Sequence, residues 1–361
     1  MPSSLRTETA NGVRHVVLSR AAEYNTITPA LRDELAAAID AADADRAVRV
    51  ILLRAEGPAF CAGYDLRGST AAQAREASRV RLEPDAQGAA SHRAAPEFDQ
   101  QAGNAPARHP TQQQTEADAR AQPASEARSE DGVRAESSRR EGATAPAPWL
   151  PGRVTDGERS QKNWDSVADL RMMGEFVATY MKLWYAKKPT LAAVQGWCIG
   201  GGTDLALCAD LIVAGESARF GYPPSRVWGT PTTAMWVYRM GLEKAKRYLL
   251  TGDEIPARTA AEIGMILECV PDDRLRANTT ALAERMALVP TTQLVMLKLL
   301  CNQTAEQMGL ASSRLLGTLF DGIARHTQEG LDFVKRAQQV GFRDAVRERD
   351  DPFGDYGSRK K

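Results

Sequence analysis

The sequence lacks the features that usually identify nucleic-acid-binding or membrane-spanning proteins. Its 361 residues carry 46 basic and 46 acidic side chains, so no excess of positive charge favours a polyanion. No uninterrupted apolar run reaches the roughly 18 residues that a membrane helix needs. The first ten residues have neither the basic start nor the apolar stretch of a secretory signal. We therefore expect a cytoplasmic protein that binds neither nucleic acid nor membranes.

Histidine and cysteine are also scarce, which limits the chemistry available. The chain has four histidines, and His92 and His109 lie in a segment of low complexity. The five cysteines form no Cys-x-x-Cys pair, and with no export signal we expect them to be reduced thiols. A zinc site or a Ser-His-Asp triad has almost no residues from which to be built. We therefore expect no metal site.

Residues 70–160 contain too few apolar side chains to form a core. Only seven of these 91 residues are Val, Ile, Leu, Met, Phe, Trp or Tyr, so burial cannot offset the entropy lost on ordering the chain. We predict a disordered insertion here, with a mobile lid containing some helix as the alternative. The remaining 270 residues are enough for one α/β domain with a helical extension.

Apolar patterns predict alternating strands and helices up to about residue 243, and mostly helices after it. Short runs rich in β-branched residues predict strands at 13–19, 48–54, 191–196 and 211–215. Thr28-Pro29 predicts the N-cap and first residue of a helix that buries Leu31, Leu35 and Ile39. Further helices are predicted over 167–185, after Pro290 and on both sides of Gly330. This order is typical of an α/β protein.

Two glycine-containing turns each follow a predicted buried strand. They are Ala62-Gly63-Tyr64-Asp65 and Gly200-Gly201-Gly202-Thr203-Asp204. In the second turn, three glycines let a ligand approach backbone amides that have no partner inside the following helix. The dipole of that helix favours negative charge on a ligand oxygen. Tight turning without a ligand is the alternative. Because neither a GxGxxG nor a GxxxxGK motif is present, we expect no dinucleotide site.

With their surroundings, these turns resemble motifs of the crotonase family, also called the enoyl-CoA hydratase/isomerase family. The matching segments are SRAAEYNTITPALRDEL, ILLRAEGPAFCAGYDL, KPTLAAVQGWCIGGGTDLALCADLIVAGESARFGYP and LTGDEIPARTAAEIGMILECV. The resemblance implies an α/β fold, a crotonase-like spiral of ββα units with a C-terminal helical region. The core would then comprise residues 1–69 and 161–270, and residues 271–361 would mediate trimerisation and cover the active site.

The resemblance also implies a ligand and site residues. The ligand would be an acyl-CoA thioester, with no cofactor beyond its own coenzyme A, and the oligomer a homotrimer or a dimer of trimers. The backbone amides of Tyr64 and Gly201 would form an oxyanion hole that stabilises a thioester enolate, and Asp204 would carry the proton. The other substrate-binding positions are Cys61 and Ala62, near the adenine, Arg67, near the CoA phosphates, and Gly63, Gly200, Gly202, Tyr222 and Ser225.

The chain departs from the family pattern at both catalytic carboxylates. Hydratases of the family carry Glu where this chain has Asp204, and a second Glu in a following FGxPE segment. Here that segment reads FGYPPSRVWG, and Pro224 or Ser225 takes the position, depending on the direction of counting. Addition of water by two carboxylates is therefore not assured. One carboxylate suffices to move a proton between carbons of a bound enolate.

Asp204 also has a purely structural interpretation. It lies in the first turn of its predicted helix, where a carboxylate stabilises the helix dipole by about 0.3–1 kcal/mol. We predict an acyl-CoA-processing enzyme of the hydratase/isomerase type. The alternatives are an acyl-CoA-binding protein without turnover and an acyl-CoA thioesterase. In the C-terminal region we expect the charged residues to face solvent. We expect inward packing, or packing against a neighbouring subunit, of Phe333, Val334, Phe342 and Val346.

Overall fold

The computed structural model describes residues 3–65 and 165–356, so the predicted insertion and Arg67 lie outside the described residues. The strands are β1 (Leu5–Ala10), β2 (Val13–Leu18), β3 (Val50–Ala55), β4 (Ala59–Cys61), β5 (Thr190–Val194), β6 (Trp197–Ile199), β7 (Leu211–Gly215), β8 (Arg219–Gly221), β9 (Ile255–Pro256) and β10 (Glu268–Val270). The α-helices are α1 (Pro29–Ala44), α3 (Ser166–Tyr185), α4 (Gly201–Leu207), α5 (Met235–Met240), α6 (Leu242–Thr251), α7 (Ala257–Glu262), α8 (Asp272–Ala287), α9 (Thr291–Gln307), α10 (Leu310–Arg325), α11 (Gln328–Val340) and α12 (Phe342–Asp350). Two 3-10 turns are η1 (Ala21–Glu23) and η3 (Pro223–Arg226).

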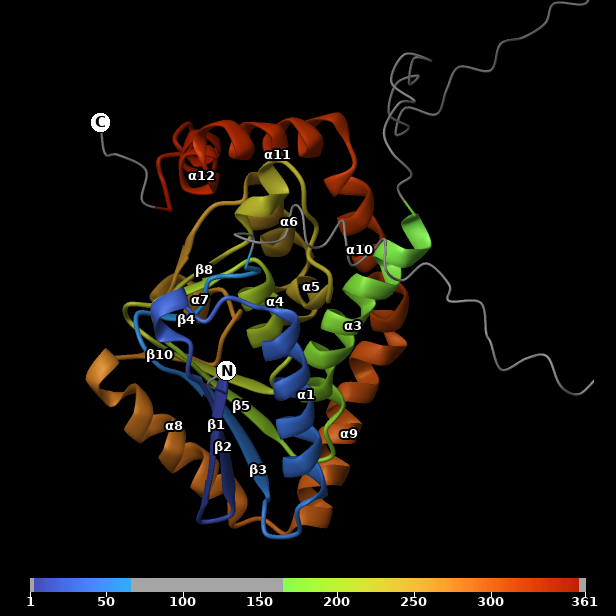
Figure 1. The fold of residues 1–361 in the computed structure, drawn as a ribbon. Coiled ribbons are helices and arrows are strands. Elements are labelled where there is room, and N and C mark those ends of the chain that lie inside the picture. Colours follow the sequence, from blue (N-terminus) through green and yellow to red (C-terminus); the bar gives the residue numbers. More distant parts are fainter. Residues whose placement is uncertain (1–2, 66–164, 357–361) are drawn as a thin grey trace, which may run out of the picture. The chain divides into compact units, whose positions relative to one another are not determined.

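A six-stranded sheet with the order β1-β2-β3-β5-β7-β10 forms the centre of the fold. It is parallel except for β1, which pairs antiparallel with β2. Alternate residues of β3 enter two cores: Ile51 and Leu53 pack with α1 and α3, whereas Val50 and Leu52 pack with α8. Figure 1 shows α1 and α8 on opposite faces of this sheet. Burial on both faces explains the continuous apolar runs in the sequence.

Helix α1 begins where the sequence predicts. The Oγ1 atom of Thr28 accepts a hydrogen bond from the Leu31 amide at 3.2 Å, and Pro29 occupies the first helical position. Leu31, Leu35 and Ile39 are buried, which confirms the predicted apolar face. The periodicity of the sequence and the capping chemistry therefore agree on this helix.

A smaller sheet with the order β4-β6-β8-β9 positions the two glycine turns. Strands β4, β6 and β8 run parallel, so their carboxyl ends meet at one edge. The segments that leave this edge are residues 62–65, 200–204 and 222–226. Ligands of open α/β sheets bind outside the carboxyl ends of the strands. The three-residue strands β6 and β8 are too short to show a period, and the sequence analysis missed them.

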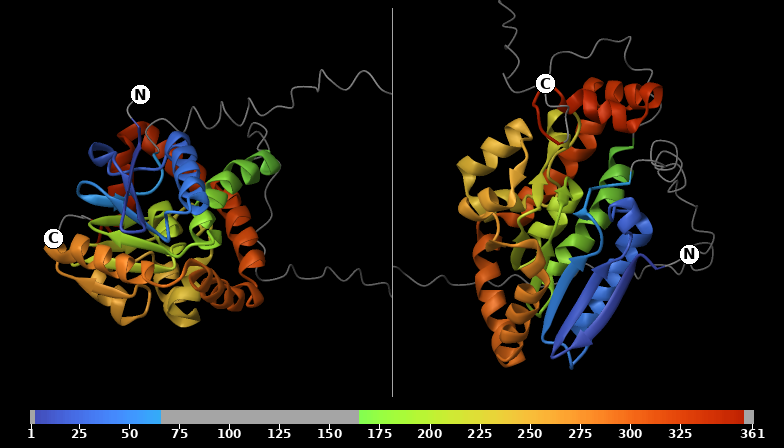
Figure 2. Two further views of the ribbon diagram at one scale, coloured as in Figure 1. Left: turned by 90° about the horizontal axis from the view of Figure 1, so that it is seen from below. Right: turned by 90° about the vertical axis from the view of Figure 1, so that its left-hand side faces the viewer.

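The C-terminal helices enclose one side and one end of the core. Helix α10 runs along α3, α9 contacts the C-terminal end of α3, and α11 and α12 cross above the smaller sheet (Figures 1 and 2). The predicted break at Gly330 is wrong, because Gly330 lies in the first turn of α11. A Cβ atom there would lie 2.5 Å from the Ala324 carbonyl oxygen, so glycine instead permits contact with the end of α10. The break between α10 and α11 lies at His326 and Thr327. Glycines separate the other two pairs of C-terminal helices, at Gly309 and Gly341, with φ angles of +88° and +89°.

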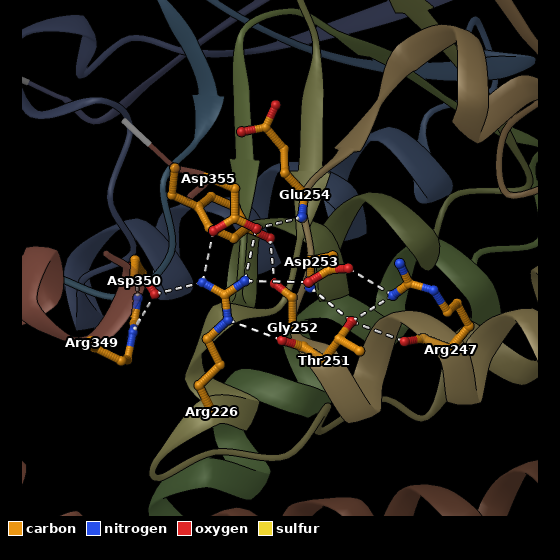
Figure 3. A network of polar contacts seen from close by, with 10 residues as sticks. Arg226, Arg247, Thr251, Gly252, Asp253, Glu254, Arg349, Asp350 and Asp355 are labelled. Atoms are coloured by element: carbon orange, nitrogen blue, oxygen red, sulfur yellow. Dashed lines mark hydrogen bonds and ion pairs between the residues drawn. The ribbon is translucent and has the colours of Figure 1, made fainter. Parts of the chain in front are cut away.

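The expected solvent-facing position of the C-terminal charges is also only partly correct. The side chain of Arg226 is 2% exposed and donates to Asp350 at 2.8 Å and to both carboxylate oxygens of Asp355 at 2.8 and 2.7 Å. Its guanidinium also lies 3.8 Å from the ring centre of Phe353. Figure 3 shows the bonds from Arg226 to Asp350 and Asp355. We call the contacts of Arg226 with Asp350, Phe353 and Asp355 the C-terminal clasp. The clasp joins the last described residues to the segment that follows β8.

Replacement of Arg226 by Met should destabilise the protein strongly. The carboxylates of Asp350 and Asp355 would lose the cation that they share. The loss in free energy of unfolding should be about 3 kcal/mol, the lower end of the range for a broken buried ion pair. The lower end applies because Arg349 still contacts Asp350. Urea unfolding measures this loss. The matched control is Arg336→Met, which breaks the half-exposed pair with Glu348 and should change stability little. Equal losses in the two variants would contradict the importance of the clasp.

Candidate active site

The two glycine turns lie in direct contact. A Cβ atom on Gly63 would lie 3.0 Å from the Ile199 carbonyl oxygen and 3.8 Å from the Gly201 amide nitrogen. On Gly202, a Cβ atom would lie 2.2 Å from the Cys61 carbonyl oxygen. Gly63 also has a φ angle of +89°, which favours glycine. Because Gly63 and Gly202 have no side chains, the two turns can lie in direct backbone contact.

Hydrogen bonds to residue 27 fix the first turn. The Ile27 amide donates to the Gly63 carbonyl at 2.8 Å, and the Asp65 amide donates to the Ile27 carbonyl at 2.9 Å. Tyr64 lies between these two bonds, and its ring packs against Gly201. A Cβ atom on Gly201 would lie 2.9 Å from the Cε2 atom of Tyr64. The predicted oxyanion-hole residues are thus neighbours in space.

The hydroxyl groups of Tyr64 and Tyr180 are buried in the same region. Each influences the pKa of the other, but neither forms a well-directed hydrogen bond among the described residues. Burial raises the pKa of both phenols, so both are neutral at physiological pH. Two buried hydroxyls with unused hydrogen-bonding capacity beside the glycine turns are suited to contact a polar substrate atom.

Asp204 is fully buried and held by residues of another segment. Its Oδ2 atom accepts hydrogen bonds from the amide and the hydroxyl of Thr232, at 2.9 and 3.0 Å, and its Oδ1 atom accepts from the Thr233 hydroxyl at 3.4 Å. Burial raises the pKa of this carboxyl to about 7, although the bonds from Thr232 and the nearby indole of Trp236 lower it. A carboxyl that is part protonated near neutrality is suited to proton transfer.

The sequence analysis did not select Asp321, which is a second buried carboxyl in this region. It lies on the buried face of α10 and is 7% exposed. Burial raises its pKa to about 6, with Asp169 raising it further and Arg325 lowering it. The signal in the sequence was an aspartate at a core-facing position of an amphipathic helix, where an unpaired charge is rarely tolerated.

The structure separates the two candidates for the position of the missing carboxylate. Pro224 lies 3.7 Å from the position that a Cβ atom on Gly200 would take, beside the second glycine turn. The buried hydroxyl of Ser225 lies instead against Gly252, 3.1 Å from the position of a Cβ atom there. Pro224 therefore borders the candidate site, and Ser225 faces the C-terminal clasp.

At three other predicted positions, the side chain or amide is engaged in the fold or is kept protonated by burial. The Tyr222 hydroxyl donates to the Thr230 carbonyl at 2.6 Å, so it is already engaged. Burial raises the pKa of the Cys61 thiol to about 12, which keeps it protonated. The Ala62 amide donates to the Tyr24 carbonyl at 3.1 Å.

The described residues contain neither a candidate metal site nor a candidate membrane span. Within residues 3–65 and 165–356, no group of three or more His, Cys, Asp or Glu side chains is arranged to hold a metal ion. In the same part of the chain, no helix has both the length and the apolar character needed to cross a membrane.

The stability of an Asp204→Asn variant relative to the wild type should increase between pH 5 and pH 8. The pKa of Asp204 is about 7 in the folded protein and has its ordinary, lower value in the unfolded chain. At pH values between these two, Asp204 is protonated in the native state and ionised in the unfolded state. Wild-type stability thus falls through this window, while Asn does not titrate. Urea unfolding at several pH values should show a relative gain on the order of 2 kcal/mol. A stability difference between the two proteins that is constant with pH would disprove the elevated pKa of Asp204.

Comparison with known proteins places the chain in a family. The family model described as enoyl-CoA hydratase/isomerase matches residues 8–88 and 158–344. The chain is 30% identical over 307 residues to "Putative enoyl-CoA hydratase EchA13" from Mycobacterium tuberculosis, a match that spans 82% of this chain and 72% of that protein. It is 36% identical over 138 residues to 2,3-dehydroadipyl-CoA hydratase from Escherichia coli, spanning 37% of this chain and 54% of the relative.

A solved structure extends the similarity to the whole fold. The crystal structure of an enoyl-CoA hydratase from Mycobacterium smegmatis shares 33% identity, with a TM-score of 0.72. The alignment covers 98% of this chain and 95% of that chain. This agreement confirms the predicted α/β crotonase fold. Together with the matched family model, it shows that the chain belongs to the enoyl-CoA hydratase/isomerase family and is an enzyme of the hydratase/isomerase type.

Proposed function

We propose that the protein binds an acyl-CoA thioester with its carbonyl oxygen between the backbone amides of Tyr64 and Gly201, and that Asp204 transfers the proton. The observation that carries this proposal is the contact between the two glycine turns, with a buried carboxyl of raised pKa on the helix that begins at the second turn. Family membership supports the substrate class. The amides then stabilise negative charge on the oxygen as the thioester becomes an enolate.

The electrostatics of Asp204 suit this step. With a pKa of about 7, the group is present in both protonation states near neutral pH. The carboxylate form can remove a proton from the carbon next to the carbonyl, and the acid form can return one. Because the carboxyl bonds to Thr232 and Thr233, its position does not depend on the substrate.

The coenzyme A portion would extend over the carboxyl edge of the smaller sheet. We assign this role to the backbone around Cys61, Ala62, Gly63, Gly200 and Gly202, and to Arg67, which lies outside the described residues. Tyr222 supports the acyl end through its bond to Thr230. The Ser225 hydroxyl lies against Gly252, and we assign Ser225 only a supporting role in this segment. A homotrimer or dimer of trimers in the cytoplasm remains part of the proposal.

The amide of Gly201 can be removed without breaking its helix. Gly201 is the first residue of α4, where proline is compatible with helical geometry. Gly201→Pro should lower kcat by about 100- to 1,000-fold, because one oxyanion donor is lost. Gly201→Ala is the matched control, since it adds the same Cβ beside Tyr64 but keeps the N–H. Similar kcat values for the two variants would refute a role for this amide.

A short enoyl-CoA provides the direct test of activity. Loss of the conjugated-thioester absorbance should accompany turnover, and Asp204→Asn should reduce kcat by about 100-fold or more. Unchanged turnover in this variant would refute the role of Asp204. Binding of acyl-CoA without any turnover by the wild type would instead indicate a binding protein. Release of the free CoA thiol would indicate a thioesterase.

A further inference from the structure

A carboxylate from α10 lies beside the position at which the second family carboxylate is missing. A Cβ atom on Gly229 would lie 2.8 Å from the Pro224 Cβ atom, 3.5 Å from Oδ1 of Asp321 and 3.6 Å from Cε1 of Tyr222. Pro224 in turn borders Gly200 in the second glycine turn. The carboxyl of Asp321 therefore approaches the same wall of the candidate site from another part of the chain.

The charges around Asp321 leave this carboxyl only weakly neutralised. Its Oδ2 atom lies 3.5 Å from the guanidinium of Arg325, which instead binds both oxygens of Asp169 at 2.8 Å. The backbone amide of Thr230 also lowers the pKa of Asp321. Since the arginine is mainly engaged by Asp169, Asp321 is not explained as a simple ion-pair partner.

Asp321 and Asp204 are linked by one short segment. Gly229, which lies beside Asp321, begins this segment, and Thr232 and Thr233 farther along it donate hydrogen bonds to Asp204. The charge of Asp321 raises the pKa of Asp204.

Both carboxyls also act on the same two phenols. The charges of Asp321 and Asp204 each raise the pKa of Tyr64 and of Tyr222, with burial the larger cause. Tyr64 is the residue whose ring packs on the second glycine turn. The two carboxyls therefore border one interior region at the proposed thioester site.

We propose that Asp321 is the second catalytic carboxyl of this enzyme, in place of the one absent at Pro224 or Ser225, and that the reaction is hydration of an enoyl-CoA. This inference rests on the proposed function. It deepens that function by naming the reaction, since two carboxyls permit addition of water where one supports only proton movement between carbons.

The step balances with the groups present. The Asp321 carboxylate takes a proton from water while the water oxygen bonds to C3 of the enoyl thioester. The C2=C3 electron pair moves into the carbonyl, forming an enolate held by the two backbone amides. Neutral Asp204 then gives its proton to C2, and the carbonyl re-forms. Proton exchange with solvent returns Asp321 to its anion and Asp204 to its acid. Near neutral pH, pKa values of about 6 and about 7 leave suitable fractions of the two forms.

The experiment compares the wild type with Asp321→Asn and Asp169→Asn from pH 5 to pH 9. Hydration is followed by enoyl-thioester absorbance, and exchange of the C2 protons of a saturated acyl-CoA with D₂O is followed by NMR. Asp321→Asn should lower hydration kcat by about 100-fold or more and abolish the acidic limb of the pH profile. It should retain proton exchange within a few-fold, because exchange needs only Asp204.

Asp169→Asn is the matched control, because it removes the other carboxylate that pairs with Arg325. It should keep hydration kcat within a few-fold and shift the acidic limb to lower pH, since Asp169 raises the pKa of Asp321. Equal losses of hydration in both variants would show that Asp321 only supports the structure, and would overturn its catalytic role. Wild-type hydration that Asp321→Asn leaves unchanged would also overturn it, without affecting the proposed function.

Two further outcomes complete the test. A wild type that neither hydrates an enoyl-CoA nor exchanges C2 protons would overturn the proposed function, and the role of Asp321 with it. If Asp321→Asn does not fold, Asp321→Glu replaces it. That variant keeps an acid and should retain an acidic limb with a displaced midpoint, while an unaltered midpoint would contradict the assignment.

Discussion

The close approach of two backbone segments is the constraint on which the candidate site depends. Side chains at Gly63 and Gly202 would collide with the carbonyl oxygens of Ile199 and Cys61. Because both turns leave parallel neighbouring strands, the smaller sheet fixes their separation before any ligand binds. The site is therefore set by backbone geometry, and the identity of the side chain at Tyr64 is left free for another task. Its ring packs on the second turn and against Phe176.

Two buried carboxyl groups of the candidate site are not fully neutralised. Asp204 is held by hydroxyl and amide donors, and Asp321 by a backbone contact and an arginine that favours another partner. Such groups destabilise the folded protein when they ionise. A contrast comes from Arg226, whose buried charge is met by several acidic side chains. The buried charge of Arg226 is thus neutralised at the clasp, whereas the buried carboxyls of Asp204 and Asp321 are not fully neutralised near the glycine turns.

Much of the fold could be predicted because its signals are local. The N-cap at Thr28 and the apolar run of β3 each specify one element from neighbouring residues. The glycine turns were predicted for the same reason. Strands β6 and β8 were missed because three residues are too few for a periodic pattern, and the break expected at Gly330 was wrong because tertiary contact, not helix termination, requires glycine there.

The site was predicted only in part for a related reason. Asp204 lies next to the glycines that mark it, whereas Asp321 belongs to a helix far along the chain and comes into the site only through packing of α10 against α3. No spacing rule connects these two residues. The burial of Asp350 was likewise hidden, because an acidic helix end usually faces water and its partner Arg226 is remote in sequence.

The clasp has a consequence for the order in which the molecule is assembled during synthesis. Arg226 borders the segment that contains Pro224, yet its acidic partners Asp350 and Asp355 are synthesised 124 and 129 residues later. Until they emerge, the guanidinium lacks Asp350 and Asp355, and the wall beside the second glycine turn is unsupported. The strands can pair before Asp350 and Asp355 are synthesised, but a competent enzyme should arise only after these two residues have joined the fold.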